Sequence, residues 1–206
     1  NRTNAPFSEG VWSVIDETMS EFLSKRLSLR SVVDFKEQYG YDTDAIFTKE
    51  LKKVSDKKDL SVSVREPIKM VEIKKRFKVS NDVIEEIKRG VEDFEDKELA
   101  DAANNFASVE NGMILNGLKE ASFEGIVSHP EVNSMEVKST KDLLSSVAKS
   151  LGAFNKEFVD GDFKLVLSSA TMAKLHTEFF DGISVKTKLD DILGSGNIVI
   201  NEDIGD

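Results

Sequence analysis

The stretch that decides the fold is ELADAANNFASVENGMILNGLKEASFEG, residues 98–125. Its apolar residues recur at intervals of three and four, a spacing that places them along one face of a helix. They are Leu99, Ala102, Ala103, Phe106, Val109, Met113, Ile114 and Leu118. No proline interrupts the stretch, and Gly125 after Phe123 supplies a stop signal. The spacing predicts one helix of about 25 residues, roughly twice the usual length.

Such a helix can cross a whole domain and carry sheets and loops as a spine, or it can be an ordinary long core helix. Gly112 and Gly117 each lower the helix propensity by up to about 1 kcal/mol, so packing is expected to keep that part helical. We call this stretch the spine helix.

Composition limits the classes of protein to consider. The chain has 206 residues, of which 39% are hydrophobic and 32% charged, enough for a real core in one or two domains. Its net charge of −10 argues against nucleic acid as the main partner, because phosphate binding needs an excess of basic residues. The chain has no cysteine, which excludes disulfides, zinc–thiolate sites and cysteine nucleophiles, and fits a reducing compartment.

The ends of the sequence and its hydropathy give further expectations. No apolar run approaches 18 residues, so no membrane span is expected. The N-terminus has no apolar signal-peptide core, and it lacks an initiator methionine, so we expect a few leading residues to be missing.

Before the spine helix, residues 1–7 read as an extended arm, since proline keeps Ala5 out of helical geometry. Ser8 is the predicted N-cap of a helix to about Leu29, which either docks on another surface or is a simple core helix. Residues 30–35 are predicted to form a short strand, and residues 36–58 a polar loop. The charged run within that loop is either solvated or an extended hairpin that reaches a neighbouring subunit.

Two further elements complete this part of the chain. Residues 60–79 alternate as a strand, with Pro67 at an edge or bulge. Ser80 or Asn81 caps a short helix over 82–89, which Gly90 stops.

The pattern changes after Gly125, and a second, α/β-like region starts near residue 127. Ser139 or Thr140 caps a helix that runs to about Phe154. Its remaining predicted elements are a strand at 163–167, a helix at 169–179, a turn at Asp181–Gly182, a short helix at 189–193 and a strand at 197–201.

A catalytic or metal constellation is not found in the sequence. His129 and His176 lie in unrelated contexts, and Gly194-Ser-Gly196 precedes a strand, the wrong order for a phosphate-binding loop. The acidic residues at 85–86 and 93–96 lack the oxygen spacing of a calcium loop. The residues alone therefore describe an α+β protein with an arm, a charged loop and a spine helix, which favours a structural or assembly role over an enzyme.

Five segments together resemble the encapsulins, also called the linocin-type bacteriocin family. They occur in the family's order and spacing: APFSEGVWSVID (5–16), RSVVDF (30–35), VREPIKMVEIKKRF (64–77), IKRG (87–90) and LKEASFEGI (118–126). The resemblance runs from about residue 5 to residue 206. Encapsulins have the tailed-phage major-capsid fold and assemble into icosahedral nanocompartments in the cytoplasm.

The resemblance implies an α+β, tailed-phage major-capsid-like fold with four parts. These are an N-terminal arm and helix (1–41), an extension loop that packs on a neighbour (42–66), a peripheral domain with the spine helix (67–134) and an axial domain (135–206). The chain stops before the family's C-terminal segment, so we expect that part to be missing. An aromatic–glycine signature is also altered to Tyr39-Gly40-Tyr41, which leaves the loop entry open.

The resemblance also implies a function and its residues. The protein would be a non-enzymatic shell protomer that encloses a ferritin-like iron-storage protein or a dye-decolourising peroxidase through the cargo's C-terminal targeting peptide. Leu27, Arg30 and Asp34 would line the peptide groove, with an intrachain ion pair as the alternative role for the charged pair. Glu178 and the loop Asp181-Gly182-Ile183 would line the five-fold pore and favour cations.

Two further expectations follow from the resemblance. Some relatives carry a flavin stacked on a tryptophan, but the matching residue here is Asp82, so no cofactor is expected. The alternative function is a major capsid protein of a phage or prophage with the same fold.

Overall fold

The structure is a computed structural model that describes residues 7–35, 39–40, 42–47, 51–57, 60–91 and 96–204. The predicted arm at residues 1–6, Tyr41, the ends of the charged run at 49–50 and 58, and most of the acidic run at 92–95 lie outside the described residues. The chain forms two compact units, Asn1–Leu27 with Phe35–His129, and Ser28–Asp34 with Pro130–Asp206. Each unit is described by itself.

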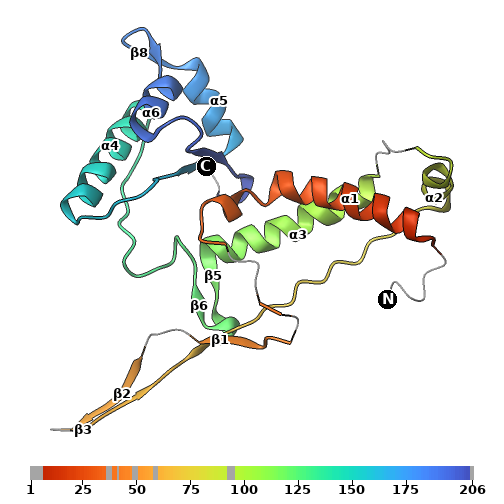
Figure 1. Ribbon diagram of the computed structural model, residues 1–206. Coiled ribbons are helices and arrows are strands. Elements are labelled where there is room, and N and C mark those ends of the chain that lie inside the picture. The colour runs from red at the N-terminus through yellow and green to blue at the C-terminus, as the bar shows by residue number, and fades with distance from the viewer. Residues whose placement is uncertain are drawn as a thin grey trace. The chain divides into compact units, whose positions relative to one another are not determined.

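The first unit is built on two long helices. Helix α1 (Glu9–Arg26) and helix α3 (Lys97–Asn116) lie side by side, and α2 (Asn81–Lys88) contacts α1 (Figure 1). Ser8 is the N-cap residue of α1 and Ser80 that of α2, which confirms both predicted helix starts. The core between these helices consists of Val11, Ile15, Ile84, Ile87 and Leu99.

The spine helix is real but shorter than predicted. It ends at Asn116, and Gly117 with a φ of 74° turns the chain into β5 (Gly117–Leu118), the 3₁₀ helix η3 (Lys119–Ala121) and β6 (Phe123–Glu124). The prediction that packing keeps Gly117 helical is therefore wrong.

The returning chain explains why the helix stops there. The last carbonyls of a helix have no partner within it and need donors from elsewhere. Ile126 N–H donates to the Ile114 carbonyl at 2.9 Å, and Val127 N–H donates to the Leu115 carbonyl at 2.8 Å. The Ser128 hydroxyl donates to the Asn116 carbonyl at 3.0 Å.

The strands of the first unit form antiparallel pairs. β1 (Ala45–Phe47) pairs with β4 (Pro67–Lys69), and β2 (Lys52–Lys57) pairs with β3 (Leu60–Val64) as a hairpin with a bulge between Lys53 and Ser55. The hairpin interpretation of the charged run is thus right in local structure, and Pro67 lies at an edge as predicted. The predicted strand over 60–79 covers only β3 and β4, because no described strand pairs with residues 70–79.

The second unit packs three helices against a parallel strand pair. Its helices are α4 (Thr140–Lys156), α5 (Ser169–Thr177) and α6 (Val185–Leu193), and β7 (Leu165–Leu167) pairs with β10 (Ile198–Ile200). Ser139, Ser168 and Ser184 cap the three helices by accepting a bond from a backbone N–H three residues on. The buried centre is Leu167, Leu175, Val185 and Leu189.

The predicted strand at residues 30–35 is wrong. The 3₁₀ helix η2 (Ser28–Ser31) and a turn occupy this segment. Its bonds are local, from Val32 N–H to the Leu29 carbonyl at 2.9 Å and from the Ser31 hydroxyl to the Ser28 carbonyl at 2.7 Å. Short-range bonds of this kind compete with strand pairing.

The last described element of this unit is another 3₁₀ helix, η4 (Glu202–Ile204).

Helix α4 ends in an unusual way. Val159 N–H donates to the Phe154 carbonyl and Phe158 N–H donates to the Asn155 carbonyl, the two bonds of a Schellman motif. The position with left-handed backbone, where glycine is usual, is Phe158 with a φ of 56°. The Phe158 side chain is 91% exposed.

Candidate functional site

The predicted pore residues gather on one hairpin of the second unit. β8 (Phe179–Phe180) pairs antiparallel with β9 (Ile183–Ser184), so Phe180 lies opposite Ile183. The two residues between the strands, Asp181 and Gly182, have φ of 54° and 77°. Asp-Gly is the pair that a tight two-residue hairpin turn with positive φ favours, so the local sequence specifies this tip. Glu178 directly precedes β8.

The tip of this hairpin is exposed and charged. The Asp181 side chain is 75% exposed, and its Oδ2 lies 3.6 Å from Nζ of Lys188 on α6, a side chain that is only 21% exposed. The ammonium groups of Lys141 and Lys188 each lie 4.5 Å from the centroid of the Phe180 ring. Glu178 accepts a hydrogen bond from the Thr140 hydroxyl at the start of α4. Two carboxylates and two ammonium groups therefore surround the hairpin.

The predicted peptide-groove residues lie at the C-cap of α1, in η2 and in the turn that follows η2. Leu27 is buried in the first unit, where its N–H donates to the Leu23 carbonyl at 2.8 Å. Arg30 is half-buried in η2 and Asp34 is exposed, and both belong to the second unit. Their role in binding stays a prediction, as does the alternative of an intrachain pair.

The β2–β3 hairpin exposes an apolar face. From here on, "the arm" means this hairpin and not the N-terminal arm at residues 1–7. Leu60, Val62 and Val64 alternate along β3 and are 67%, 45% and 50% exposed. Residues two apart in a strand share a face, so the three form one stripe. A two-stranded hairpin is marginally stable by itself in water, and an exposed apolar stripe on it is typical of a surface that a partner covers.

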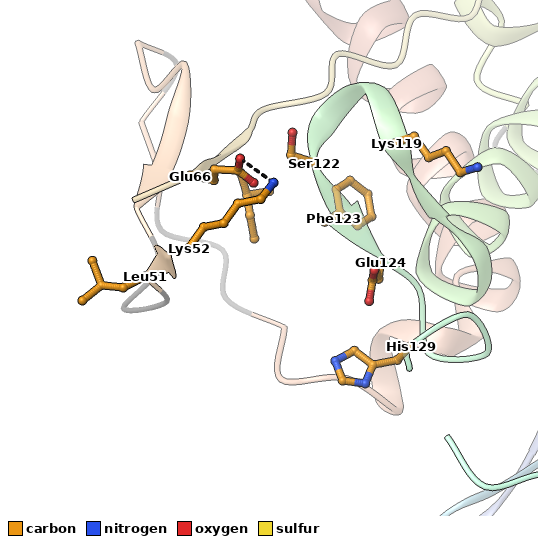
Figure 2. A pocket seen from close by; sticks show the side chains of 9 residues that line it. Leu51, Lys52, Glu66, Lys119, Ser122, Phe123, Glu124 and His129 are labelled. Carbon is orange, nitrogen blue, oxygen red and sulfur yellow. Dashed lines mark hydrogen bonds and ion pairs between the residues drawn. The ribbon is translucent and has the colours of Figure 1, made fainter. Parts of the chain in front are cut away.

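A hollow of about 760 Å³ lies at the base of the arm, within the first unit. Figure 2 shows the Lys52–Glu66 ion pair on one side of it and Phe123, Glu124 and His129 on the other. The Lys52 Nζ to Glu66 Oε1 distance is 3.0 Å. The remaining lining residues are Leu51, Ile68, Lys119 and Ser122.

Several of these residues are not evident from the sequence. Thr140 and Lys141 reach the hairpin from α4, far from it in the chain, and no sequence spacing reports such contacts. Lys188 comes from α6, which directly follows β9, but its contact with Asp181 was not foreseen. The only signal is the aromatic pair Phe179–Phe180 beside the Asp-Gly turn.

The described residues were also searched for other kinds of site. Within them, no group of three or more metal-ligating side chains comes together. None of the described helices is long and apolar enough to cross a membrane.

Comparison with known proteins gives one consistent result. A family model described as "Encapsulating protein for peroxidase" matches residues 1–206. A type 1 encapsulin shell protein of Brevibacterium linens is 28% identical over 200 residues, covering 96% of this chain and 75% of the relative. One from Mycobacterium tuberculosis is 24% identical over 200 residues, with the same two coverages.

The fold itself is similar to a solved structure. A virus-like particle from Pyrococcus furiosus matches with a TM-score of 0.59 and 18% identity, over 93% of this chain and 74% of that one. This likeness confirms the α+β, capsid-like fold that the sequence predicts.

Proposed function

The chain belongs to the encapsulin family, whose model is described as encapsulating protein for peroxidase, and from this premise we propose that it is the shell protomer of a protein nanocompartment. The observation that carries the proposal is the family match over residues 1–206, joined to a capsid-like fold over 93% of the chain. Its role in the shell is to assemble rather than to catalyse, and the shell forms in the cytoplasm.

The arm supports the assembly role physically. A lone protomer leaves the apolar stripe of β3 in water, and each Val or Leu side chain gains about 1.5–3 kcal/mol when it is buried. In the shell, the arm, within the extension loop 42–66, packs on a neighbouring copy and buries that stripe. Such a head-to-tail contact can close into rings around a symmetry axis.

The proposed cargo is an enzyme held by its C-terminal peptide. The family description names peroxidase, which favours a dye-decolourising peroxidase as cargo over a ferritin-like iron-storage protein. Of the expected groove residues, Arg30 and Asp34 belong to the second unit and satisfy polar groups of the peptide. The hairpin at Asp181 lines the five-fold opening through which small molecules pass.

The test is to purify the full-length protein and examine it by size-exclusion chromatography and negative-stain electron microscopy, with mass spectrometry of what co-purifies. We expect megadalton icosahedral particles with a peroxidase or ferritin-like passenger. A monomer or small oligomer would contradict the shell role. Particles filled with DNA and no enzyme would instead support a phage capsid protein.

A further inference from the structure

The tip of the β8–β9 hairpin carries its own counter-charge. The exposed carboxylate of Asp181 faces the Lys188 ammonium at 3.6 Å, and Lys188 comes from α6 with only 21% of its side chain exposed. A ring of such tips therefore does not present bare carboxylates. Each negative charge has a positive charge of the same protomer beside it.

The geometry holds Lys188 in this place. Its ammonium lies 4.5 Å from the centroid of the Phe180 ring, an aromatic side chain that packs against the core of the second unit. A cation over an aromatic face gains about 0.5–2 kcal/mol, more when it is partly desolvated. Lys188 thus has two favourable contacts, with the ring and with the carboxylate, and leaving the tip would forfeit both.

The other charges near the tip also balance. The Lys141 ammonium lies 4.5 Å from the Phe180 ring centroid, and the Glu178 carboxylate is engaged by the Thr140 hydroxyl. These four side chains carry two positive and two negative charges, and the Lys186–Asp190 ion pair at the start of α6 adds one charge of each sign. This balance differs from the acidic ring that Glu178 and Asp181 alone would give.

We propose that Lys188 sets the charge of the shell opening lined by this hairpin, so that the opening is charge-balanced and does not select cations. The inference rests on the proposed function, in which hairpins of several copies surround one opening. Neutral and anionic small molecules are then admitted as readily as cations. Replacing Lys188 by a neutral residue would convert the opening into a cation-selective acidic ring.

The test measures the electrostatic potential at the tip with a single thiol. The chain has no cysteine, so Ile183→Cys introduces a unique thiol beside the turn. Its reaction rates with a cationic and an anionic methanethiosulfonate reagent of similar size are compared at low salt. The same measurement is repeated in this background with Lys188→Gln, with Lys188→Arg as the charge-preserving control, and with Lys188→Gln combined with Asp181→Asn.

We expect Lys188→Gln to raise the cation-to-anion rate ratio about four-fold, because the loss of one nearby unit charge in water changes each rate roughly two-fold in opposite directions. Lys188→Arg should leave the ratio unchanged, and adding Asp181→Asn to Lys188→Gln should remove the increase. An unchanged ratio in Lys188→Gln particles would overturn the inference.

The size of the particles separates the two proposals. If the parent protein stays a small oligomer, the shell role fails, whereas the rate ratio on that oligomer still tests whether Lys188 neutralises the tip. If particles form and the ratio does not respond to Lys188→Gln, only the pore inference fails.

Discussion

Phe158 has an unfavourable left-handed backbone and a side chain that packs against little. Its φ of 56° is a conformation that costs a residue with a Cβ about 1–2 kcal/mol. The side chain is 91% exposed and so gains little from packing. Glycine is the residue that normally ends a helix in this way.

We therefore predict that Phe158→Gly stabilises the second unit by about 1 kcal/mol, measured as a shift of the urea unfolding midpoint. The matched control is Phe158→Ala, which removes the ring but keeps the Cβ, and should leave the midpoint nearly unchanged. Equal midpoints for the Gly and Ala variants would show that the left-handed backbone is not strained.

At the scale of the element, the end of α3 depends on two glycines that lie back to back. A Cβ on Gly125 would come within 2.3 Å of both Gly117 N and Leu115 O, which are backbone atoms and cannot rotate away. Gly112, inside the same helix, has no atom within 4 Å of its Cβ position other than its neighbours in the chain and the nearby backbone of its own helix. The two sites therefore give opposite expectations for the same substitution.

We predict that Gly125→Ala costs about 3 kcal/mol, because the helix end and the returning chain must separate. Gly112→Ala should stabilise α3 by up to about 1 kcal/mol, because alanine is the better helix former. Both are measured by chemical unfolding of the full chain. A mild loss at Gly125, similar to the effect at Gly112, would contradict the close approach.

The same helix end shows which features of the fold a sequence can predict. Helix starts at Ser80 and Ser139 depend on contacts between residues close in the chain, so the sequence pattern identifies them. The same holds for the hairpin tip at the Asp181–Gly182 turn. The stop of α3 depends on Val127 and Ser128, which return from beyond the helix to its last carbonyls. Apolar spacing continues past that point and cannot report it.

In the candidate site, too, some features follow from neighbouring residues in the chain and others depend on distant contacts. The position of Asp181 and Gly182 on an exposed tip follows from local turn preference. The charge at that tip depends on Lys188, on the helix that directly follows β9, and on Lys141, which approaches through tertiary packing of α4. The expected preference for cations considered only the two carboxylates, and it stays a prediction.

At the scale of the whole molecule, assembly should depend on one face of the arm. We predict that Leu60→Thr, Val62→Thr and Val64→Thr together leave each protomer folded but raise the concentration needed for assembly at least ten-fold. The reason is that three apolar side chains no longer gain burial at the neighbour, and about 1.4 kcal/mol already corresponds to a factor of ten. Size-exclusion chromatography across a dilution series measures this.

The opposite face of the same strand provides the control. Ser61→Thr with Ser63→Thr keeps β propensity and changes side chains off the apolar stripe, so assembly should match the parent protein. Equal assembly of the triple variant and this control would contradict the packing of the arm on a neighbour.

Under the proposed function, we expect loading of the passenger to depend on Arg30 in η2 and on Asp34 shortly after it. We predict that Arg30→Ala with Asp34→Ala leaves particle formation intact and lowers the amount of enzyme that co-purifies, because the peptide loses its polar partners. The passenger-to-shell ratio from quantitative mass spectrometry of gradient-purified particles measures the loss. Lys25→Ala, on the exposed side of α1 where it pairs with Glu21, is the matched control and should load normally. Normal loading of intact double-variant particles would contradict the groove, and failure of the double variant to assemble would support an intrachain structural role for the pair.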